Sequence, residues 1–283
     1  MSTGKYQIRT MTRDELDLAV DWAAAEGWNP GLDDAECFFQ TDPSGFLVGL
    51  LDDQPIGSIS VVKYENHFGF LGFYIIRQEY RNQGYGYKLW QAGMETLAGR
   101  NIGLDGVVAQ QDNYRKSGFS LAWRNIRYAG YGGGVVPDCD DIVDIASLPL
   151  ETIVHYDRRF FPAQRNAFLT SWSRMKHGRA LGILSGKQLT AYGVIRQCRN
   201  GYKIGPLFAD NAEAAEKLFL ALKAPLTARV PVYLDVPENN LAAVRLAEKY
   251  RMGKVFETAR MYTGEVPKME LSGIFGITSF ELG

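Results

Sequence analysis

Arg81-Asn82-Gln83-Gly84-Tyr85-Gly86 is the stretch of this 283-residue sequence that says most about its fold. It follows a strand-like apolar segment, residues 70–76, and precedes residues 88–97, whose apolar side chains recur at helical spacing. A strand, a glycine loop and a helix in this order leave unpaired backbone N–H groups at the positive end of the helix. Such an end binds pyrophosphate, provided that no Cβ at Gly84 or Gly86 blocks the backbone. The alternative is a tight strand-to-helix turn with no ligand.

A second pattern follows about twenty residues later and favours the first of these interpretations. Residues 103–108 have the composition of a strand, and residues 110–116 form a short helical segment that carries Asn113 and Tyr114. Ser117-Gly118-Phe119 then predicts a tight turn into another strand.

Together these residues resemble the GNAT superfamily of acyl-CoA-dependent N-acyltransferases. The phosphate loop of that family has Arg or Gln, two residues, Gly, one residue, and Gly or Ala, and Arg81-x-x-Gly84-x-Gly86 matches it. The later signature of the family is an Asn-containing helix with a Tyr four residues before Gly-Phe, which Asn113, Tyr114 and Gly118-Phe119 match. The resemblance covers roughly residues 5–130 and implies an α/β fold whose mixed, mostly antiparallel sheet is flanked by helices.

Composition and charge exclude several classes of protein. The sequence is 46% hydrophobic, 22% charged and 12% aromatic, which is typical of a soluble globular protein. A net charge of −1 argues against bulk attraction to nucleic acid or to a membrane. The first six residues lack the apolar core of a signal peptide, and no apolar run is long enough to span a bilayer. Cys37, Cys139 and Cys198 are far apart, so we expect no disulfide framework, no metal site and a cytoplasmic setting.

The first half of the chain reads as alternating strands and helices. Thr12 and Glu15 form a capping-box pattern at the start of a helix that we expect to end near Glu26. A second helix is predicted from Asp33 to Gln40. The predicted strands are residues 6–10, 45–51, 56–64 and 67–76.

A glycine cluster, residues 130–134, indicates a domain boundary because so many glycines sustain a helix or strand poorly. We therefore predict two tandem GNAT-like domains, residues 1–130 and 138–283, joined by a linker of residues 131–137. The second half repeats the first in outline. Its predicted strands are 142–145, 179–184, 189–196, 202–208 and 232–235, with a closing strand over 275–283; its helices are 151–156, 164–171, 212–222 and 240–250.

The repeat fails at the positions that matter for the cofactor. Asp210-Asn211-Ala212-Glu213 stands where the phosphate loop would be, and its acids would repel a pyrophosphate. Lys249 stands where the first half has Tyr114. We therefore expect a degenerate second half that binds no cofactor and contributes to the acceptor pocket.

The resemblance assigns roles to residues of the first half. It implies that acetyl-CoA, or another acyl-CoA, lies along the strand before the loop and on the loop itself, with Asn113 orienting it. Tyr114 would give a proton to the departing thiolate, and the alternative is a packed Tyr whose hydroxyl is satisfied. Asn113 could instead only cap its helix. The expected cofactor contacts are Tyr74, Ile75, Ile76, Arg81, Asn82, Gln83, Gly84, Tyr85, Gly86 and Asn113.

The sequence leaves the general base and the acceptor site open. The acids and histidine considered for the base are Glu65, His67, Glu79 and Asp105, and a chain of water molecules is the alternative. Trp28 and Asn29 lie in the region that lines the acceptor pocket in the family, and Asp105 is a further candidate there. The stretch from Asp157 to Lys203 holds ten Lys or Arg residues and one acid. Arg158 and Arg165 could therefore hold an anionic group of the acceptor, or could simply be surface charges.

The favoured hypothesis is an N-acetyltransferase that acts on a small amine or amino acid, as a monomer or homodimer. One alternative is a non-catalytic acyl-CoA-binding sensor that controls a partner, although a pure binder has no need of an acid at Tyr114. Another is protein lysine acetylation, which usually needs an open groove that a second domain would tend to close.

Overall fold

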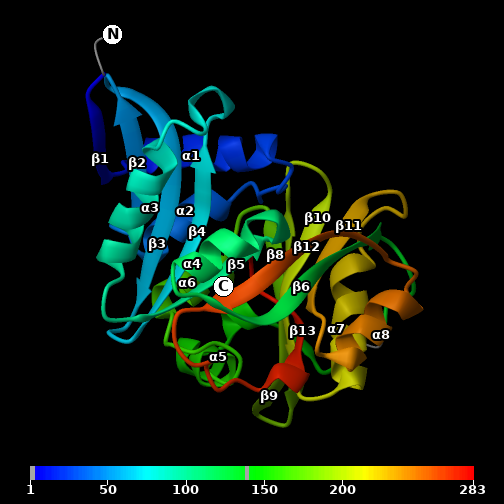
Figure 1. Ribbon diagram of the computed structural model, residues 1–283. Helices are drawn as coiled ribbons and strands as arrows, with labels where there is room; N and C mark the ends of the chain where they lie inside the picture. The colour runs from blue at the N-terminus through cyan, green and yellow to red at the C-terminus, as the bar shows by residue number, and fades with distance from the viewer. Residues whose placement is uncertain (1–3, 138–139) are drawn as a thin grey trace.

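The computed structural model describes residues 4–137 and 140–283 of the chain, so Cys139 and the first residue of the predicted second domain, Asp138, lie outside the described residues. The elements of the first half follow the predicted order (Figure 1). They are β1 (Tyr6–Thr10), α1 (Arg13–Ala25), α2 (Asp34–Thr41), β2 (Phe46–Leu51), β3 (Gln54–Tyr64), β4 (Phe68–Ile76), α3 (Tyr85–Thr96), β5 (Asn101–Val107), α4 (Gln111–Lys116) and β6 (Ser120–Tyr131).

The second half repeats this order. Its elements are β7 (Ile142–Asp144), α5 (Leu150–Asp157), α6 (Asn166–Trp172), β8 (Gly178–Ser185), β9 (Gln188–Gln197), β10 (Tyr202–Ala209), α7 (Ala212–Lys223), β11 (Pro231–Pro237), α8 (Leu241–Lys249), β12 (Gly253–Tyr262) and β13 (Ile274–Gly276). None of the helices among the described residues is long and apolar enough to cross a bilayer.

Local sequence signals explain the helix and strand boundaries. Thr12 caps α1 by accepting from the N–H of Glu15, while the Glu15 carboxylate accepts from the N–H of Thr12, which confirms the capping box. The glycine cluster falls partly inside a strand, because Gly130 and Tyr131 pair with Val232 and Pro231 of β11. The chain leaves β6 only after Tyr131.

Both halves contribute to one 13-stranded sheet of order β1-β2-β3-β4-β5-β12-β6-β11-β10-β9-β8-β7, with β13 paired to β10 off this path. The fold class is therefore confirmed as a mixed, mostly antiparallel sheet flanked by helices, and β4–β5 and β10–β11 are its parallel pairs. The halves exchange strands at the centre of the sheet. β6 follows β5 in the chain but pairs with β11, and β12 follows β11 but pairs with β5. Figure 1 shows β12 and β6 running side by side where the halves meet.

Two buried ion pairs lie across the exchanged strands. Arg260 of β12 stands opposite Asp105 of β5, with Nη2 2.5 Å and Nε 3.0 Å from the carboxylate oxygens. Arg127 of β6 stands opposite Asp235 of β11 in the same way, at 2.7 and 2.8 Å. Each pair joins a strand of one half to a strand of the other, so the charges are satisfied only when the exchange is complete.

The hydrophobic core has three parts. A central cluster includes Leu16 of α1, Phe38 of α2 and Trp172 of α6, so it belongs to both halves. Phe38 and Trp172 stack with ring centroids 5.8 Å apart. A second cluster lies under α3 and a third under α7 and α8. The central cluster is the reason that the two halves are packed against each other rather than linked as separate bodies.

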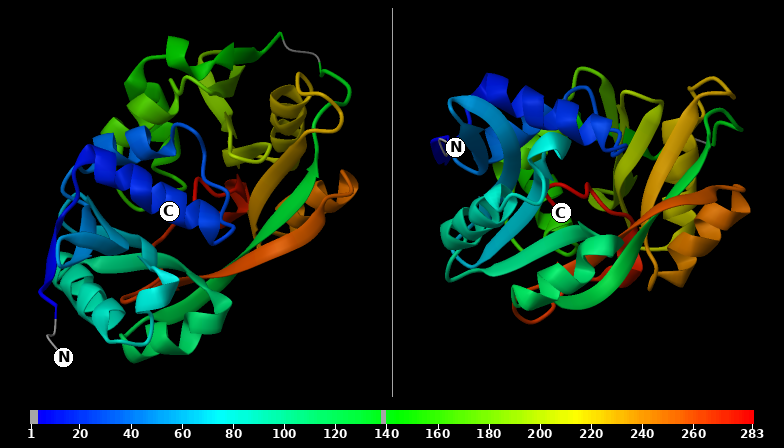
Figure 2. Two further views of the ribbon diagram at one scale, coloured as in Figure 1. Left: turned by 90° about the horizontal axis from the view of Figure 1, so that it is seen from above. Right: turned by 45° about the horizontal axis from the view of Figure 1, so that its top comes forward.

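The last residues of the chain cross from one half to the other, so the prediction of a closing strand over 275–283 is wrong beyond Gly276. β13 pairs with β10, but residues 277–283 leave the sheet and are buried. The Tyr64 hydroxyl of β3 donates to the Leu282 carbonyl at 3.0 Å, and Arg165 donates to the carbonyl of Gly283 at 3.4 Å. Side chains thus satisfy backbone groups that a strand neighbour would otherwise bind. In both views of Figure 2 this end lies at the centre of the molecule.

Candidate active site

A cavity of about 490 Å³ opens where β4 separates from β5. The two strands pair only from Phe68–Asn101 to Leu71–Leu104, and beyond Leu71 the edge of β4 faces the cavity. A bulge helps β4 to diverge: Phe73 has a φ of +43°, and its carbonyl accepts from the Ser58 hydroxyl at 2.8 Å. The volume lies in the range of small-molecule sites, roughly 300–1,000 Å³.

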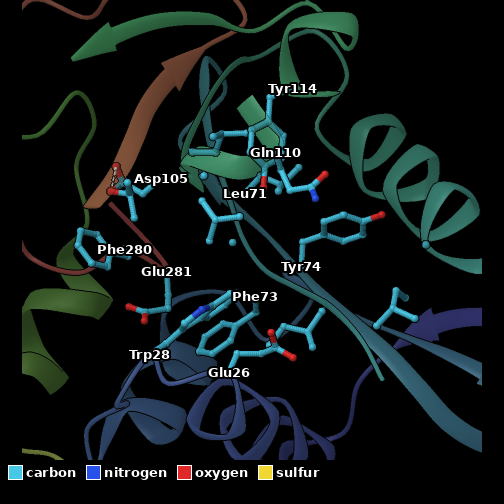
Figure 3. A pocket seen from close by; sticks show the side chains of 18 of the residues that line it. Glu26, Trp28, Leu71, Phe73, Tyr74, Asp105, Gln110, Tyr114, Phe280 and Glu281 are labelled. Atoms are coloured by element: carbon cyan, nitrogen blue, oxygen red, sulfur yellow. Dashed lines mark hydrogen bonds between the residues drawn. The ribbon is translucent and has the colours of Figure 1, made fainter. Parts of the chain in front are cut away.

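The cavity walls come from both halves of the chain (Figure 3). The first half supplies residues 71–76 of β4, part of the glycine loop, and residues 104–107 of β5. The second half supplies Phe256 and Thr258 of β12 and Phe280 and Glu281 of the crossing segment. Figure 3 shows Tyr114 and Gln110 at one end of the cavity and Trp28 at the other.

The glycine loop has the geometry of an anion-binding helix start. The first helical hydrogen bond of α3 joins the Lys88 N–H to the Gly84 carbonyl, so the N–H groups of Tyr85, Gly86 and Tyr87 have no acceptor within the helix. Gly84 has a φ of +85°, and a Cβ there would meet no protein atom within 4 Å. Gly86 is needed for packing, because its Cβ would lie 2.8 Å from the Tyr74 hydroxyl. The open side of Gly84 leaves room for a phosphate group.

Side chains around the loop hold its conformation. The Arg81 Nε donates to the Ile76 carbonyl at 2.7 Å, and its Nη2 donates to the carboxylate of Glu26. Gln83 donates to the Glu79 carbonyl at 2.8 Å, so its side chain faces back along the loop. The Tyr85 carbonyl accepts from the Tyr6 hydroxyl of β1. Asn82, with a φ of +62°, lines the cavity, whereas Gln83 and Tyr85 do not.

Tyr114 lies on α4 with its ring against β5. Gly106 permits this contact, because a Cβ there would lie 2.1 Å from the Tyr114 ring. Burial, with a smaller contribution from Tyr74, raises the pKa of Tyr114 to about 12. The hydroxyl therefore keeps its proton at neutral pH, as a proton donor must. Asn113 is exposed and reaches the site only indirectly, by donating to the Gln110 amide oxygen at 2.7 Å.

Of the three residues expected at the acceptor end, Trp28 and Asp105 line the cavity and Asn29 does not. Trp28 lines the cavity, and its carbonyl accepts from Arg127 at 3.0 Å and from Lys203 at 3.1 Å. Asn29 does not line it; its side chain exchanges two hydrogen bonds with the backbone of Asn200. The Asp105 carboxylate borders the cavity but is bound by Arg260 and by the Asn125 amide at 2.7 Å.

The arginines considered for an anionic acceptor group do not reach the cavity. Arg165 is fully buried against Asp157, with two hydrogen bonds of 2.8 and 2.6 Å. Arg158 donates to the carbonyl of Phe161. Two further arginines of the basic stretch pair with acids of the first half: Arg196 with Asp34 of α2 and Arg199 with Asp21 of α1. The structure therefore does not bring Arg158 or Arg165 to the site.

Of the four candidates for the general base, Asp105 lines the cavity, and the other three lie outside its lining. The Glu65 carboxylate accepts from the N–H of Gln164, a His67 ring nitrogen lies 3.2 Å from the Pro162 carbonyl, and Glu79 pairs with Arg77. The structure instead brings in Glu26 and Glu281, which the sequence analysis did not select. The only signal for Glu281 was a single acid in the apolar run Phe280-Glu281-Leu282.

Comparisons with known proteins agree with this geometry. Residues 9–119 match a family model described as "Acetyltransferase (GNAT) family", and residues 153–276 match one described as "Acetyltransferase (GNAT) domain". The chain is 32% identical over 270 residues to "Holothin acyltransferase" of Pseudoalteromonas sp. (strain SANK 73390), covering 95% of this chain and 92% of the relative.

Two solved structures share the fold. A putative acetyltransferase from Pyrococcus horikoshii superimposes with a TM-score of 0.83 at 23% identity, covering 100% of this chain and 97% of the other. A tandem GNAT protein from the clavulanic acid biosynthesis pathway gives a TM-score of 0.61 at 12% identity, covering 93% and 100%. This chain belongs to the GNAT superfamily of acyltransferases and carries two GNAT domains in tandem.

Proposed function

We propose that this protein is an N-acyltransferase that moves the acyl group of acetyl-CoA, or of a closely related acyl-CoA, to the amine of a small molecule. The observation that carries the proposal is the convergence of three features on one cavity: the open edge of β4, the unpaired N–H groups at the start of α3, and the protonated Tyr114. The acyl-CoA supplies an activated thioester.

Each feature has a distinct task in this reaction. The backbone of Tyr74, Ile75 and Ile76 lies along the open edge of β4, where it can hydrogen-bond an extended pantetheine arm as a neighbouring strand would. The N–H groups of Tyr85, Gly86 and Tyr87 bind pyrophosphate oxygens. The Tyr114 hydroxyl donates its proton to the departing thiolate.

The acceptor enters from the side of Trp28, Phe280 and Glu281. The relative named above is an acyltransferase that by its name acts on holothin, which supports a small molecule as the acceptor here. Residues of β12 and of the crossing segment form the cavity wall on the side of the second half, so a folded protein surface fits this site less well than a small amine does.

Isothermal titration with acetyl-CoA, followed by an assay for CoA release with a panel of amines, tests the proposal. We expect one acetyl-CoA site per chain and amine-dependent release of CoA. Two sites per chain would contradict the assignment of the first half as the working one. Binding without release by any amine would instead support an acyl-CoA sensor.

A further inference from the structure

Glu281 is a buried carboxylate that nothing in the fold uses. Its exposed fraction is 2%, it lines the cavity, and neither carboxylate oxygen has a hydrogen-bond partner among the described residues. Buried charges are normally paired, because removing a carboxylate from water is costly. The Glu281 main chain, in contrast, is anchored: its carbonyl accepts from the Ser60 hydroxyl, and Gly72 passes so close that a Cβ would lie 2.3 Å from that oxygen.

Three buried cations, Arg127, Arg196 and Lys203, lie close enough to Glu281 for their charges to interact with it. Against the effect of burial, the pKa of Arg127 is raised mainly by Asp235 and that of Arg196 mainly by Asp34, whereas burial lowers the pKa of Lys203; Glu281 is a further charge that acts on all three. Each of the three has a partner other than Glu281: Arg127 binds Asp235, the Arg196 Nε binds Asp34, and Lys203 binds the Trp28 carbonyl. The Arg196 Nη1, like the Glu281 carboxylate, is buried without a hydrogen-bond partner among the described residues. Glu281 thus remains available to a group that enters the cavity.

The rest of the cavity wall indicates what that group belongs to. Aromatic side chains form its apolar surface: Trp28, Phe73, Phe256 and Phe280 line it together with Glu281. Among the described lining residues the single cation is Arg81, and its guanidinium is bound by Glu26. Glu26 and Asp105 are in turn bound by Arg81 and Arg260, so Glu281 is the carboxylate of this wall that has no ion-pair partner among the described residues. A carboxylate or phosphate on the acceptor would find no free cation at this end, whereas an apolar ring that carries an amine finds both a wall and a carboxylate.

We propose that Glu281 receives the amine of the acceptor and takes its proton during transfer, and that the acceptor is an aromatic amine without an anionic group. This rests on the acyl transfer proposed above. The amine nitrogen forms a bond to the acyl carbon and the carbon–sulfur bond breaks. The amine proton passes to Glu281, and the thiolate takes the proton of Tyr114. The second half of the chain thereby supplies a catalytic residue to the site of the first half.

The first test compares Glu281→Gln with a matched control, Glu265→Gln, an exposed carboxylate outside the cavity. The acceptors are p-toluidine and 2-phenylethylamine, with acetyl-CoA as donor. We expect Glu281→Gln to lower kcat/KM about 100-fold, in the range for loss of a general base, while acetyl-CoA affinity stays within about twofold. Glu265→Gln should behave as the wild type. Turnover by Glu281→Gln at the wild-type rate would overturn the proposal. The unchanged acetyl-CoA titration shows that the variant is folded.

The second test compares amines that differ by one carboxylate. p-Toluidine is paired with 4-aminobenzoate, and 2-phenylethylamine with phenylalanine. We expect the member without a carboxylate in each pair to bind the wild-type complex with CoA at least about tenfold more tightly by titration, because the carboxylate finds no free cation. Preference for the carboxylate member, or no binding of either amine that lacks a carboxylate, would overturn the acceptor assignment. Failure of acetyl-CoA itself to bind would overturn the proposed function first, so the two failures are distinguishable.

Discussion

The two halves have similar backbones where their parallel strands separate, but they differ in what occupies the gap that opens there. In each half a parallel strand pair separates after a few residues, at Leu71 in β4 and at Ile204 in β10. Both strands carry an extra residue at this point, where two positions on the separating strand face one on its antiparallel neighbour. In the first half the gap is the cavity. In the second half the chain fills it, because β13 pairs with Leu207 and Phe208 of β10.

The helices that follow these strands show the same contrast. The N–H groups at the start of α3 have no acceptor in the helix, whereas the Asn211 side chain caps α7 by accepting from the N–H of Ala214. Asp210 and Glu213 add negative charge beside α7. The comparison teaches that this fold provides the same gap twice, and that in the second half the chain itself occupies the strand edge and caps the helix start.

The largest expected effect concerns the two buried ion pairs that join the halves. Asp105→Asn and Asp235→Asn should each destabilise the protein by about 3–5 kcal/mol, because each leaves a buried arginine without its anion. Urea unfolding measures both free energies. Near-equal losses would show that the two crossings are equivalent supports of the sheet. A loss below 1 kcal/mol for either variant would contradict the role given to that pair.

The next largest effect is on acetyl-CoA binding, and it distinguishes the N-terminus of α3 from that of α7. Gly84→Val should weaken acetyl-CoA binding more than about 100-fold, because a branched side chain at a φ of +85° strains the loop and occupies the phosphate side. Asn211→Ala, at the corresponding place in the second half, should leave acetyl-CoA affinity unchanged and cost about 1 kcal/mol of stability through the lost cap. Titration and thermal unfolding of both variants give the two readouts. Equal losses of affinity would remove the distinction between the halves.

A kinetic difference is expected between Tyr114 and its counterpart Lys249. Tyr114→Phe should lower kcat about 100-fold while acetyl-CoA affinity changes little, because only the proton donor is removed. Lys249→Met should not change kcat, because Lys249 is an exposed residue that pairs with Glu216. Steady-state kinetics with saturating acetyl-CoA measure kcat for both variants and test this difference. Unchanged turnover in Tyr114→Phe would show that another group protonates the thiolate.

The smallest effect is a dependence of stability on pH that belongs to the first half. Burial raises the pKa of Tyr114 from 10.0 to about 12 in the folded protein, so the unfolded chain loses this proton at lower pH than the folded chain does. The contribution of Tyr114 to stability is therefore complete below about pH 10 and is lost as the pH rises towards 12. The difference in unfolding free energy between wild type and Tyr114→Phe should shrink over this window. A difference that stays constant from pH 8 to pH 11.5 would contradict the shift.

Local patterns predicted the parts of the fold that neighbouring residues decide. The capping box of Thr12 and Glu15 and the loop from Arg81 to Gly86 depend on hydrogen bonds and φ angles within a few residues. Tyr114 and the edge of β4 could likewise be placed by motif, because the strand, loop and helix follow one another directly. The missing loop at Asp210 and Asn211 was equally visible in the sequence.

The sequence by itself determined the order of the elements, the GNAT resemblance and the half that carries the glycine loop. Only the tertiary structure decided that β6 and β12 change partners, that β13 fills the second gap, and that Glu281 reaches the cavity of the first half. The physical reason is that these contacts join residues far apart in the sequence, from 66 positions for Phe208 and Ile274 upward. A strand pattern specifies that its N–H and C=O groups need a partner, but it does not specify which edge supplies one.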